Sequence, residues 1–198
     1  MKYVIMADGK GSRWDNFMGH SKHDIRIGGE TLLERTVRLV CSLDPEAEVI
    51  ITSHDPSCSV PGARRYEPEN NVLEIDRFTA ELIGDDMCFL YGDVLYSEDA
   101  MRTIVQARGT APLLFFGSES SICAVLVGDG ELFGRLYRTV RERFLDGLIA
   151  ECKGWQVYHL YAGLPLEGRD IGQSYVLLDS FTRDFNSPED YLKFASEN

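Results

Sequence analysis

The residues best placed to do chemistry follow the first apolar run of the chain. There, Asp8-Gly9-Lys10-Gly11-Ser12-Arg13 forms a glycine-rich, charged loop. Such glycines let backbone N–H groups approach a bound polyphosphate closely. The Walker pattern G-x-x-x-x-G-K-[ST] is absent, and Trp14 stands where the dinucleotide fingerprint requires a third glycine. A phosphate cradle and a plain turn between a strand and a helix therefore both remain open for this loop.

Composition limits the kind of protein that carries this loop. The chain has 198 residues, of which 44% are hydrophobic, and this suits one compact globular domain over 1–198. No apolar run reaches the ~20 residues of a membrane-spanning helix. The opening residues reach Gly9 too early for a signal peptide. Five scattered cysteines without a C-x-x-C pair predict reduced thiols, no zinc site and a cytoplasmic location.

The net charge of −12 excludes a nucleic-acid partner, because such a field repels phosphate backbones. Binding of a triphosphate would then depend on a few local cations, on backbone N–H groups and on a divalent metal.

Strands and helices are expected to alternate through the first half of the chain. This alternation predicts a mostly parallel sheet that is covered on both faces. The pattern favours strands at 3–7, 48–52, 87–91, 113–116, 122–127, 155–161 and 175–178, with a short strand near Arg65. It favours helices at 30–42, 71–83 (capped by Asn71), 97–107 and 130–148, and a final helix opened by Ser187-Pro188.

Four segments in the correct order carry a resemblance to a known family. The run from Ile5 to Arg35 contains G-x-G-x-R, Lys22, Gly28-Gly29 and T-L-L-E-R, and it resembles the N-terminal signature of the nucleotidyltransferase superfamily. That superfamily includes sugar-phosphate nucleotidyltransferases, cytidylyltransferases and molybdenum-cofactor guanylyltransferases. Asn70-Asn71, the strand-end L-Y-G-D-V at 90–94 and D-F-N-S-P-E-D-Y at 184–191 resemble its later motifs, whereas residues 112–170 match none.

The resemblance implies an α/β, Rossmann-like, three-layer (GT-A-like) fold with a mixed, mostly parallel sheet. A nucleotide-binding half would cover about 1–110 and an acceptor-binding half about 111–198. The resemblance assigns catalytic roles to Arg13 and Lys22. It assigns Mg²⁺ to Asp93 and Asp184, with Asn186 able to share that role, since hard cations prefer carboxylate oxygen. The nucleotide-binding residues would be Ala7, Asp8, Gly9, Gly11, Ser12, Asn71 and Gly92.

The implied reaction is Mg²⁺-dependent transfer of a nucleoside monophosphate from an NTP, CTP being favoured, to a small phosphorylated acceptor such as a sugar phosphate. Pyrophosphate is released, and a role in cell-surface polysaccharide synthesis is expected. The anionic acceptor supplies its own nucleophilic oxygen, so no general base is required. A homodimer is a family-level expectation.

Asp8 departs from the family, which has alanine or glycine there. Its carboxylate could bind metal, hydrogen-bond the loop, mark a changed phosphate site, or serve as a plain turn residue. Two alternatives follow. A nucleotide-sugar glycosyltransferase would share the architecture, but this sequence reads D-V-L at Asp93 and so lacks the D-x-D metal motif of that class. A catalytically silent nucleotide-binding domain is favoured by Asp8 alone.

The acceptor side offers weaker candidates. Arg135, Arg138, Arg141 and Arg143 lie near helical spacing and read either as a clamp for the acceptor phosphate or as a solvated helix face. The Arg64-Arg65 pair has the same two interpretations. Trp155, Tyr158 and Tyr161 could line the acceptor pocket or fill the core.

Overall fold

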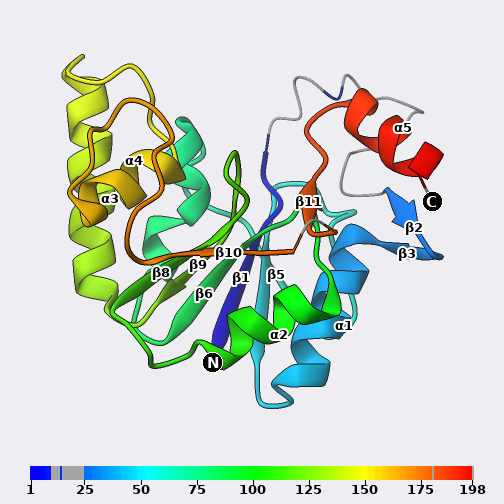
Figure 1. Ribbon diagram of the computed structural model, residues 1–198. Coiled ribbons are helices and arrows are strands. Elements are labelled where there is room, and N and C mark those ends of the chain that lie inside the picture. The colour runs from blue at the N-terminus through cyan, green and yellow to red at the C-terminus, as the bar shows by residue number, and fades with distance from the viewer. Residues whose placement is uncertain (10–13, 15–24, 180, 198) are drawn as a thin grey trace.

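A seven-stranded sheet forms the centre of the protein (Figure 1). The computed structural model describes residues 1–9, 14, 25–179 and 181–197. From one edge to the other, the strands are β10 (Tyr175–Leu177), β8 (Leu113–Gly117), β9 (Ile122–Val127), β6 (Met87–Tyr91), β1 (Lys2–Met6), β4 (Glu48–Thr52) and β5 (Arg64–Tyr66).

Strand directions confirm the predicted mixed, mostly parallel sheet. β1 is parallel to both β4 and β6, β4 is parallel to β5, and β10 is parallel to β8. β9 runs antiparallel to its neighbours β6 and β8. The carboxyl ends of β1, β4 and β6 therefore meet at one edge of the sheet, where open α/β sheets place their ligands.

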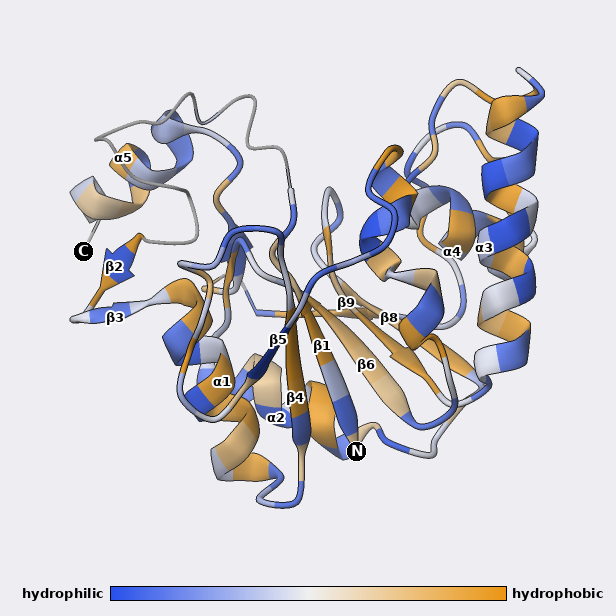
Figure 2. Ribbon diagram, turned by 180° about the vertical axis from the view of Figure 1, so that it is seen from behind, coloured by the Kyte–Doolittle hydropathy of each residue, from blue (hydrophilic) through white to orange (hydrophobic). Residues whose placement is uncertain are grey.

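Two helical layers cover the sheet, because successive residues of each buried strand point to opposite faces. Tyr3 and Ile5 of β1 pack in a cluster with α1 (Leu32–Leu43) and α2 (Glu98–Gln106). Val4 and Met6 pack with α3 (Gly130–Leu145) and α4 (Gly154–Ala162). Figure 2 shows the apolar central strands between helices of mixed character. The three-layer fold predicted from the sequence is confirmed.

The segment from Arg26 to α1 follows its sequence signals closely. β2 (Arg26–Ile27) and β3 (Glu30–Thr31) form a hairpin whose turn, Gly28-Gly29, has two positive φ values, a conformation that favours glycine. Thr31 then caps α1 in a capping box with Glu34. The Thr31 N–H donates to Glu34 Oε2 at 2.7 Å, and the Glu34 N–H donates to Thr31 Oγ1 at 3.1 Å. This cap starts the helix at Leu32, two residues after the expected position.

The predicted helix at 71–83 is wrong. Two 3₁₀ helices occupy this region, η3 (Glu74–Phe78) and η4 (Ala80–Leu82), and Thr79 between them has a φ of 48°. Asn71 does not cap a helix, because its side chain is bonded to Asp8. Spacing alone did not separate the two helix types.

The predicted strand at 155–161 is also wrong, since these residues lie in α4. The backbone N–H of Lys153 donates to Gln156 Oε1 at 3.0 Å just before the helix, and Gly163 ends it with a φ of 69°. Most of α4 is buried, so its apolar residues show no clean helical stripe. The α3 helix ends at Leu145, three residues before the expected end.

A third, smaller core holds the C-terminal segment. β11 (Arg183–Asp184) pairs antiparallel with β7 (Val94–Leu95), and α5 (Pro188–Glu197) follows as predicted. Phe185 is fully buried there, in a cluster with Trp14, Ile25, Leu32, Leu95 and Phe194. Figures 1 and 2 both show α5 beside the β2–β3 hairpin, so this cluster joins the C-terminal segment to the residues that lead into α1.

Two simpler expectations concern membranes and thiols. Within the part of the chain that the structure describes, no helix has both the length and the apolar character needed to cross a bilayer. The five cysteines are free. Burial raises the pKa of the Cys88 and Cys123 thiols well above their ordinary range, so these are inert core side chains.

One buried charge ties the 3₁₀ segment to α3. Asp76 is 1% exposed and accepts hydrogen bonds from the backbone N–H groups of Val72 (3.2 Å) and Leu73 (2.8 Å). It also accepts from Tyr137 Oη and Arg141 Nε, each at 2.9 Å. Burial alone would raise the pKa of this carboxyl group, but these donors outweigh burial and leave its pKa below the ordinary value.

Asp76→Asn should lower the free energy of unfolding by about 3 kcal/mol at pH 7, because it leaves Arg141 without its anion. A lowered folded-state pKa gives stability that is present above the ordinary carboxyl pKa of 3.8 and lost as pH falls through the folded value. Urea unfolding should therefore show a gap between wild type and variant that shrinks below that pH. Asp86→Asn is the control. It removes an exposed ion pair with Arg108 and should cost under about 1 kcal/mol. Equal losses would contradict the assignment.

Candidate functional site

A cleft of about 460 Å³ opens beyond the carboxyl end of β6. Its walls come from segments far apart in the sequence, namely η3, the β6–β7 turn, the β8–β9 hairpin, the start of α4, the loop before β10, and β11. Its lining residues are Glu74, Arg77, Tyr91, Asp93, Val94, Ser120, Ser121, Ile122, Lys153, Gly154, Trp155, Arg169, Asp184 and Asn186. This is the edge at which a parallel sheet binds ligands.

Asp93 and Asp184 line this cleft together, although they come from different halves of the chain. The β7–β11 ladder joins them, because Asp184 stands opposite Val94 and the Phe185 N–H donates to the Asp93 carbonyl at 2.9 Å. Ser121 Oγ donates to Asp184 Oδ2 at 3.0 Å, and the Asn186 side-chain amide donates to the same oxygen. Such supporting donors orient a carboxylate for a ligand.

This donor set suits one magnesium ion bound jointly with a substrate. Mg²⁺ is commonly held by one or two carboxylates, with substrate phosphates and waters completing its shell. Asp93 and Asp184 supply two carboxylates, and Asp93 is 7% exposed at the cleft wall. Within the described ranges no group of three or more His, Cys, Asp or Glu side chains is arranged to hold a metal, so a closed all-protein cage is not found there.

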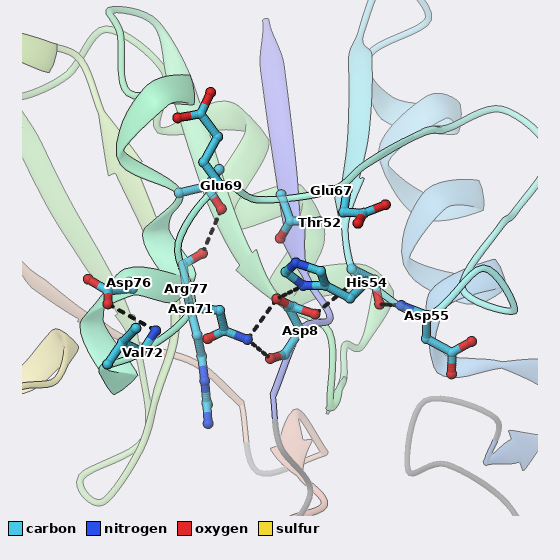
Figure 3. Close-up of polar contacts among 12 residues, drawn as sticks. Asp8, Thr52, His54, Asp55, Glu67, Glu69, Asn71, Val72, Asp76 and Arg77 are labelled. Atoms are coloured by element: carbon cyan, nitrogen blue, oxygen red, sulfur yellow. Dashed lines mark hydrogen bonds and ion pairs between the residues drawn. The ribbon is translucent and has the colours of Figure 1, made fainter.

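Asp8 has specific partners at the carboxyl edge of the sheet (Figure 3). Its Oδ1 accepts from the His54 backbone N–H at 2.8 Å, and its Oδ2 lies 2.8 Å from His54 Nδ1. Asn71 Nδ2 donates both to Asp8 Oδ2 and to the Asp8 carbonyl, each at 2.7 Å. Asp8 therefore braces three loops, those after β1, β4 and β5. The side chain of Asp8 is 9% exposed, so its interpretation as a plain turn residue facing solvent is wrong.

Two further predicted residues lie at the same edge. The Gly92 N–H donates to the Met6 carbonyl at 3.0 Å, and a Cβ at Gly92 would lie 2.8 Å from that oxygen. Only glycine fits this close approach of the β6 end to β1. Ala7 is buried, and its N–H donates to the Thr52 carbonyl. Gly9 is the last described residue of this loop before Trp14, and Gly11, Ser12, Arg13 and Lys22 lie outside the described residues.

The predicted acceptor-side arginines do not line the cleft. Arg141 is bonded to Asp76, Arg135 pairs with Glu131, and Arg65 donates to the Ser53 carbonyl. The clamp interpretation of the α3 arginines is therefore not supported. Trp155 lines the cleft and stacks on Tyr175 with 9° between the ring planes, whereas Tyr158 is fully buried in the core.

The sequence did not single out the cations that do line the cleft. Arg77 lay inside the helix expected at 71–83, Lys153 preceded an expected strand, and Arg169 lies in an irregular loop. None of these sequence contexts indicates that the side chain lies in a cleft. His54 was detectable in principle, since it follows β4 at the carboxyl edge beside β1.

Tyr91 lines the cleft, but its hydroxyl group is not a nucleophile near neutral pH. Burial raises the pKa of its hydroxyl well above the ordinary range, although the nearby Arg77 charge acts in the opposite direction. A phenol in this environment stays neutral near pH 7. The cleft lining thus combines two carboxylates, a donor type that suits a hard cation, with basic side chains of the type that suits an anion.

Asp8→Ala should lower the free energy of unfolding by about 1–3 kcal/mol, because donors from His54 and Asn71 lose a shared anionic acceptor. Urea unfolding would measure this. Asp55→Ala is the matched control, since it removes an exposed carboxylate that accepts from the Ser57 N–H. If the control lost as much stability as Asp8→Ala, the bracing role would be contradicted.

Comparison with known proteins supports the nucleotidyltransferase resemblance. No protein-family model matches the chain. The bifunctional protein GlmU of Ruegeria sp. (strain TM1040) is 27% identical over 146 residues, which cover 67% of this chain and 30% of that protein. The chain thus matches less than a third of the length of this curated relative.

Solved structures share the fold over nearly the whole chain. The nucleoside-diphosphate-sugar pyrophosphorylase from Vibrio cholerae RC9 superposes with a TM-score of 0.68 at 14% identity, covering 99% of this chain and 100% of that one. The CTP:phosphocholine cytidylyltransferase from Streptococcus pneumoniae superposes with a TM-score of 0.60 at 11% identity, covering 99% and 98%. The expected nucleotidyltransferase fold is confirmed.

Proposed function

We propose that this protein is a nucleotidyltransferase, which moves a nucleoside monophosphate from an NTP to a small phosphorylated acceptor and releases pyrophosphate. The observation that carries the proposal is the meeting of Asp93 and Asp184 in one cleft that also presents Arg77, Lys153 and Arg169. Carboxylates for a divalent cation and basic groups for anions are the two requirements of phosphoryl chemistry. The fold and the 27% identical relative agree with this activity.

Asp93 and Asp184 are the residues that would hold Mg²⁺. When bound, the ion supplies charge neutralisation at the phosphate oxygens on which negative charge develops. Ser121 and Asn186 fix the direction of Asp184 by donating to one of its oxygens. That arrangement sets the carboxylate in place before substrate arrives, so little reorganisation is needed later.

The rest of the reaction depends on positioning. An oxygen of the acceptor phosphate forms a bond to the α-phosphorus of the NTP, the α–β P–O bond breaks, and pyrophosphate leaves. The attacking oxygen is already an anion at neutral pH, so no protein base is needed. Arg13 and Lys22 are proposed to offset the triphosphate charge, and the edge formed by Ala7, Asp8, Asn71 and Gly92 is proposed to receive the nucleotide.

CTP is our proposed donor, in keeping with the cytidylyltransferase among the similar structures. Family resemblance is the basis of four further proposals. These are a sugar-phosphate acceptor, a cytoplasmic location, a homodimer and a role in cell-surface polysaccharide synthesis. The alternative of a silent nucleotide-binding domain loses its one argument, because Asp8 is engaged in a brace by His54 and Asn71. No contact favours the glycosyltransferase alternative.

Pyrophosphate release tests the proposal directly. CTP, UTP, GTP and ATP would each be incubated with Mg²⁺ and a panel of sugar phosphates. We expect release with one NTP that depends on the acceptor, and a fall of about 10³-fold or more in Asp93→Ala. Asp86→Ala, which removes a carboxylate from the exposed pair with Arg108, should keep full activity. Failure of the wild type to bind any of the four NTPs in calorimetry would refute the proposal.

Ser121→Ala should raise the Mg²⁺ concentration needed for half-maximal activity by about tenfold, because loss of a supporting donor weakens a metal site by that order. Its effect at saturating Mg²⁺ should be smaller. Ser42→Ala serves as control, since Ser42 only donates to the Leu39 carbonyl of α1. An unchanged Mg²⁺ dependence would show that Asp184 needs no such support.

A further inference from the structure

We propose that Arg77 and Arg169 form an anion-binding pair that binds the phosphate group of the acceptor and selects it over a neutral or carboxylate group. This inference deepens the proposed function and rests on it. A phosphomonoester has three terminal oxygens. One attacks the NTP, and the other two remain for the fork-shaped guanidinium groups.

The charge balance of the cleft lining contrasts with that of the whole molecule. The chain carries a net charge of −12, yet in this cleft three basic side chains stand beside three acidic ones, Glu74, Asp93 and Asp184. The basic side chains come from three separate segments. Arg77 belongs to η3, Lys153 immediately precedes α4, and Arg169 lies in the loop between α4 and β10. A gathering of cations from distant segments on an acidic protein points to an anionic ligand.

The three cations differ in their partners. Lys153 Nζ is bonded to Glu151 at 2.7 Å and lies 3.9 Å from Glu74, so its charge is already matched. Within the described ranges, Arg77 forms no ion pair and its guanidinium donates no hydrogen bond. Arg169 donates only to the Ser120 carbonyl, at 3.2 Å. Besides the Lys153 hydrogen bond, the Arg169 charge also contributes to the lowered pKa of the Glu151 carboxyl group, so that charge is partly matched. Among the described residues, neither arginine forms a close ion pair with a carboxylate.

Arg77 stands on a rigid support. It directly follows Asp76, which accepts two hydrogen bonds from its own turn and two from Tyr137 and Arg141 of α3. The hydrogen bond to Ser120 ties the Arg169 guanidinium to the β8–β9 hairpin. The Arg77 backbone and the Arg169 guanidinium are therefore placed before the ligand arrives, which lowers the ordering cost of binding.

The size and the remaining lining of the cleft suit a phosphate with a small organic group attached. Its volume of about 460 Å³ exceeds that of phosphate alone. Trp155 and Ile122 offer apolar surface, while Ser120 and Ser121 offer hydroxyl groups. Asp93 and Asp184 oppose an anion in the same cleft, so binding of the phosphate should strengthen when a divalent cation is present.

Calorimetric titration with inorganic phosphate, in Mg²⁺, tests the pair without knowledge of the true acceptor. We expect wild type to bind phosphate and not acetate. Arg77→Gln and Arg169→Gln should each weaken phosphate binding about tenfold or more, the loss typical of one charged hydrogen-bonding group. Arg102→Gln on α2, an exposed arginine that does not line the cleft, should bind like wild type. Arg77→Lys should recover part of the affinity.

Three results would overturn the inference: no phosphate binding to the wild type, unchanged binding in both arginine variants, or a loss of CTP affinity with phosphate affinity unchanged. The last would assign the arginines to the triphosphate. The outcome is separable from that of the proposed function. Phosphate binding that depends on Arg77 and Arg169, without any pyrophosphate release, would contradict the transferase activity but support the anion-binding pair. Pyrophosphate release together with unchanged phosphate binding in the arginine variants would support the transferase activity but contradict the pair.

Discussion

The short ladder between β7 and β11 is the contact on which the site depends. Asp93 lies in the turn that follows the central strand β6, whereas Asp184 lies near the end of the chain, and closing so long a loop costs conformational entropy. Few backbone bonds join the two strands, so burial must supply the rest. Phe185 is fully buried next to Asp184, in the cluster that also holds Leu95 of β7. Burial of a phenylalanine side chain contributes about 1.5–3 kcal/mol, which offsets much of that cost.

A second constraint aligns the two sides of the cleft. Asp76 holds η3 against α3, and the residues on either side of it reach different parts of the candidate site. Asn71, upstream, donates to Asp8 at the carboxyl edge of the sheet, and Arg77, downstream, lines the cleft. Because one buried carboxylate fixes this segment, the Asp8 contacts and the cleft keep a constant relation. The charge on Asp76 is stable in the interior because four donors satisfy it.

Much of this was accessible from the sequence, and the exceptions have physical causes. Buried parallel strands are recognisable in a sequence as short apolar runs. The run at 87–91 therefore also indicated that its strand ends before Gly92-Asp93. The pairing of Asp184 with the β6–β7 turn was reached only through family resemblance, because register between distant segments leaves no local pattern. The helix α4 was mistaken for a strand since burial on all sides removes periodicity. Arg77 and Arg169 were missed because a lone arginine looks the same in a solvated turn and in a cleft.

The central claim is that Asp93 and Asp184 bind one divalent cation together with the nucleotide. A double-mutant cycle tests it, with CTP affinity measured by calorimetry in Mg²⁺ for wild type, Asp93→Asn, Asp184→Asn and the double variant. If both carboxylates bind one ion, each single variant loses CTP affinity. The double variant then loses little more affinity than the single variant with the larger loss, since the effects of coupled groups are non-additive. Losses that simply add, or single variants that bind CTP with unchanged affinity, would contradict a shared ion and leave the two carboxylates with separate roles.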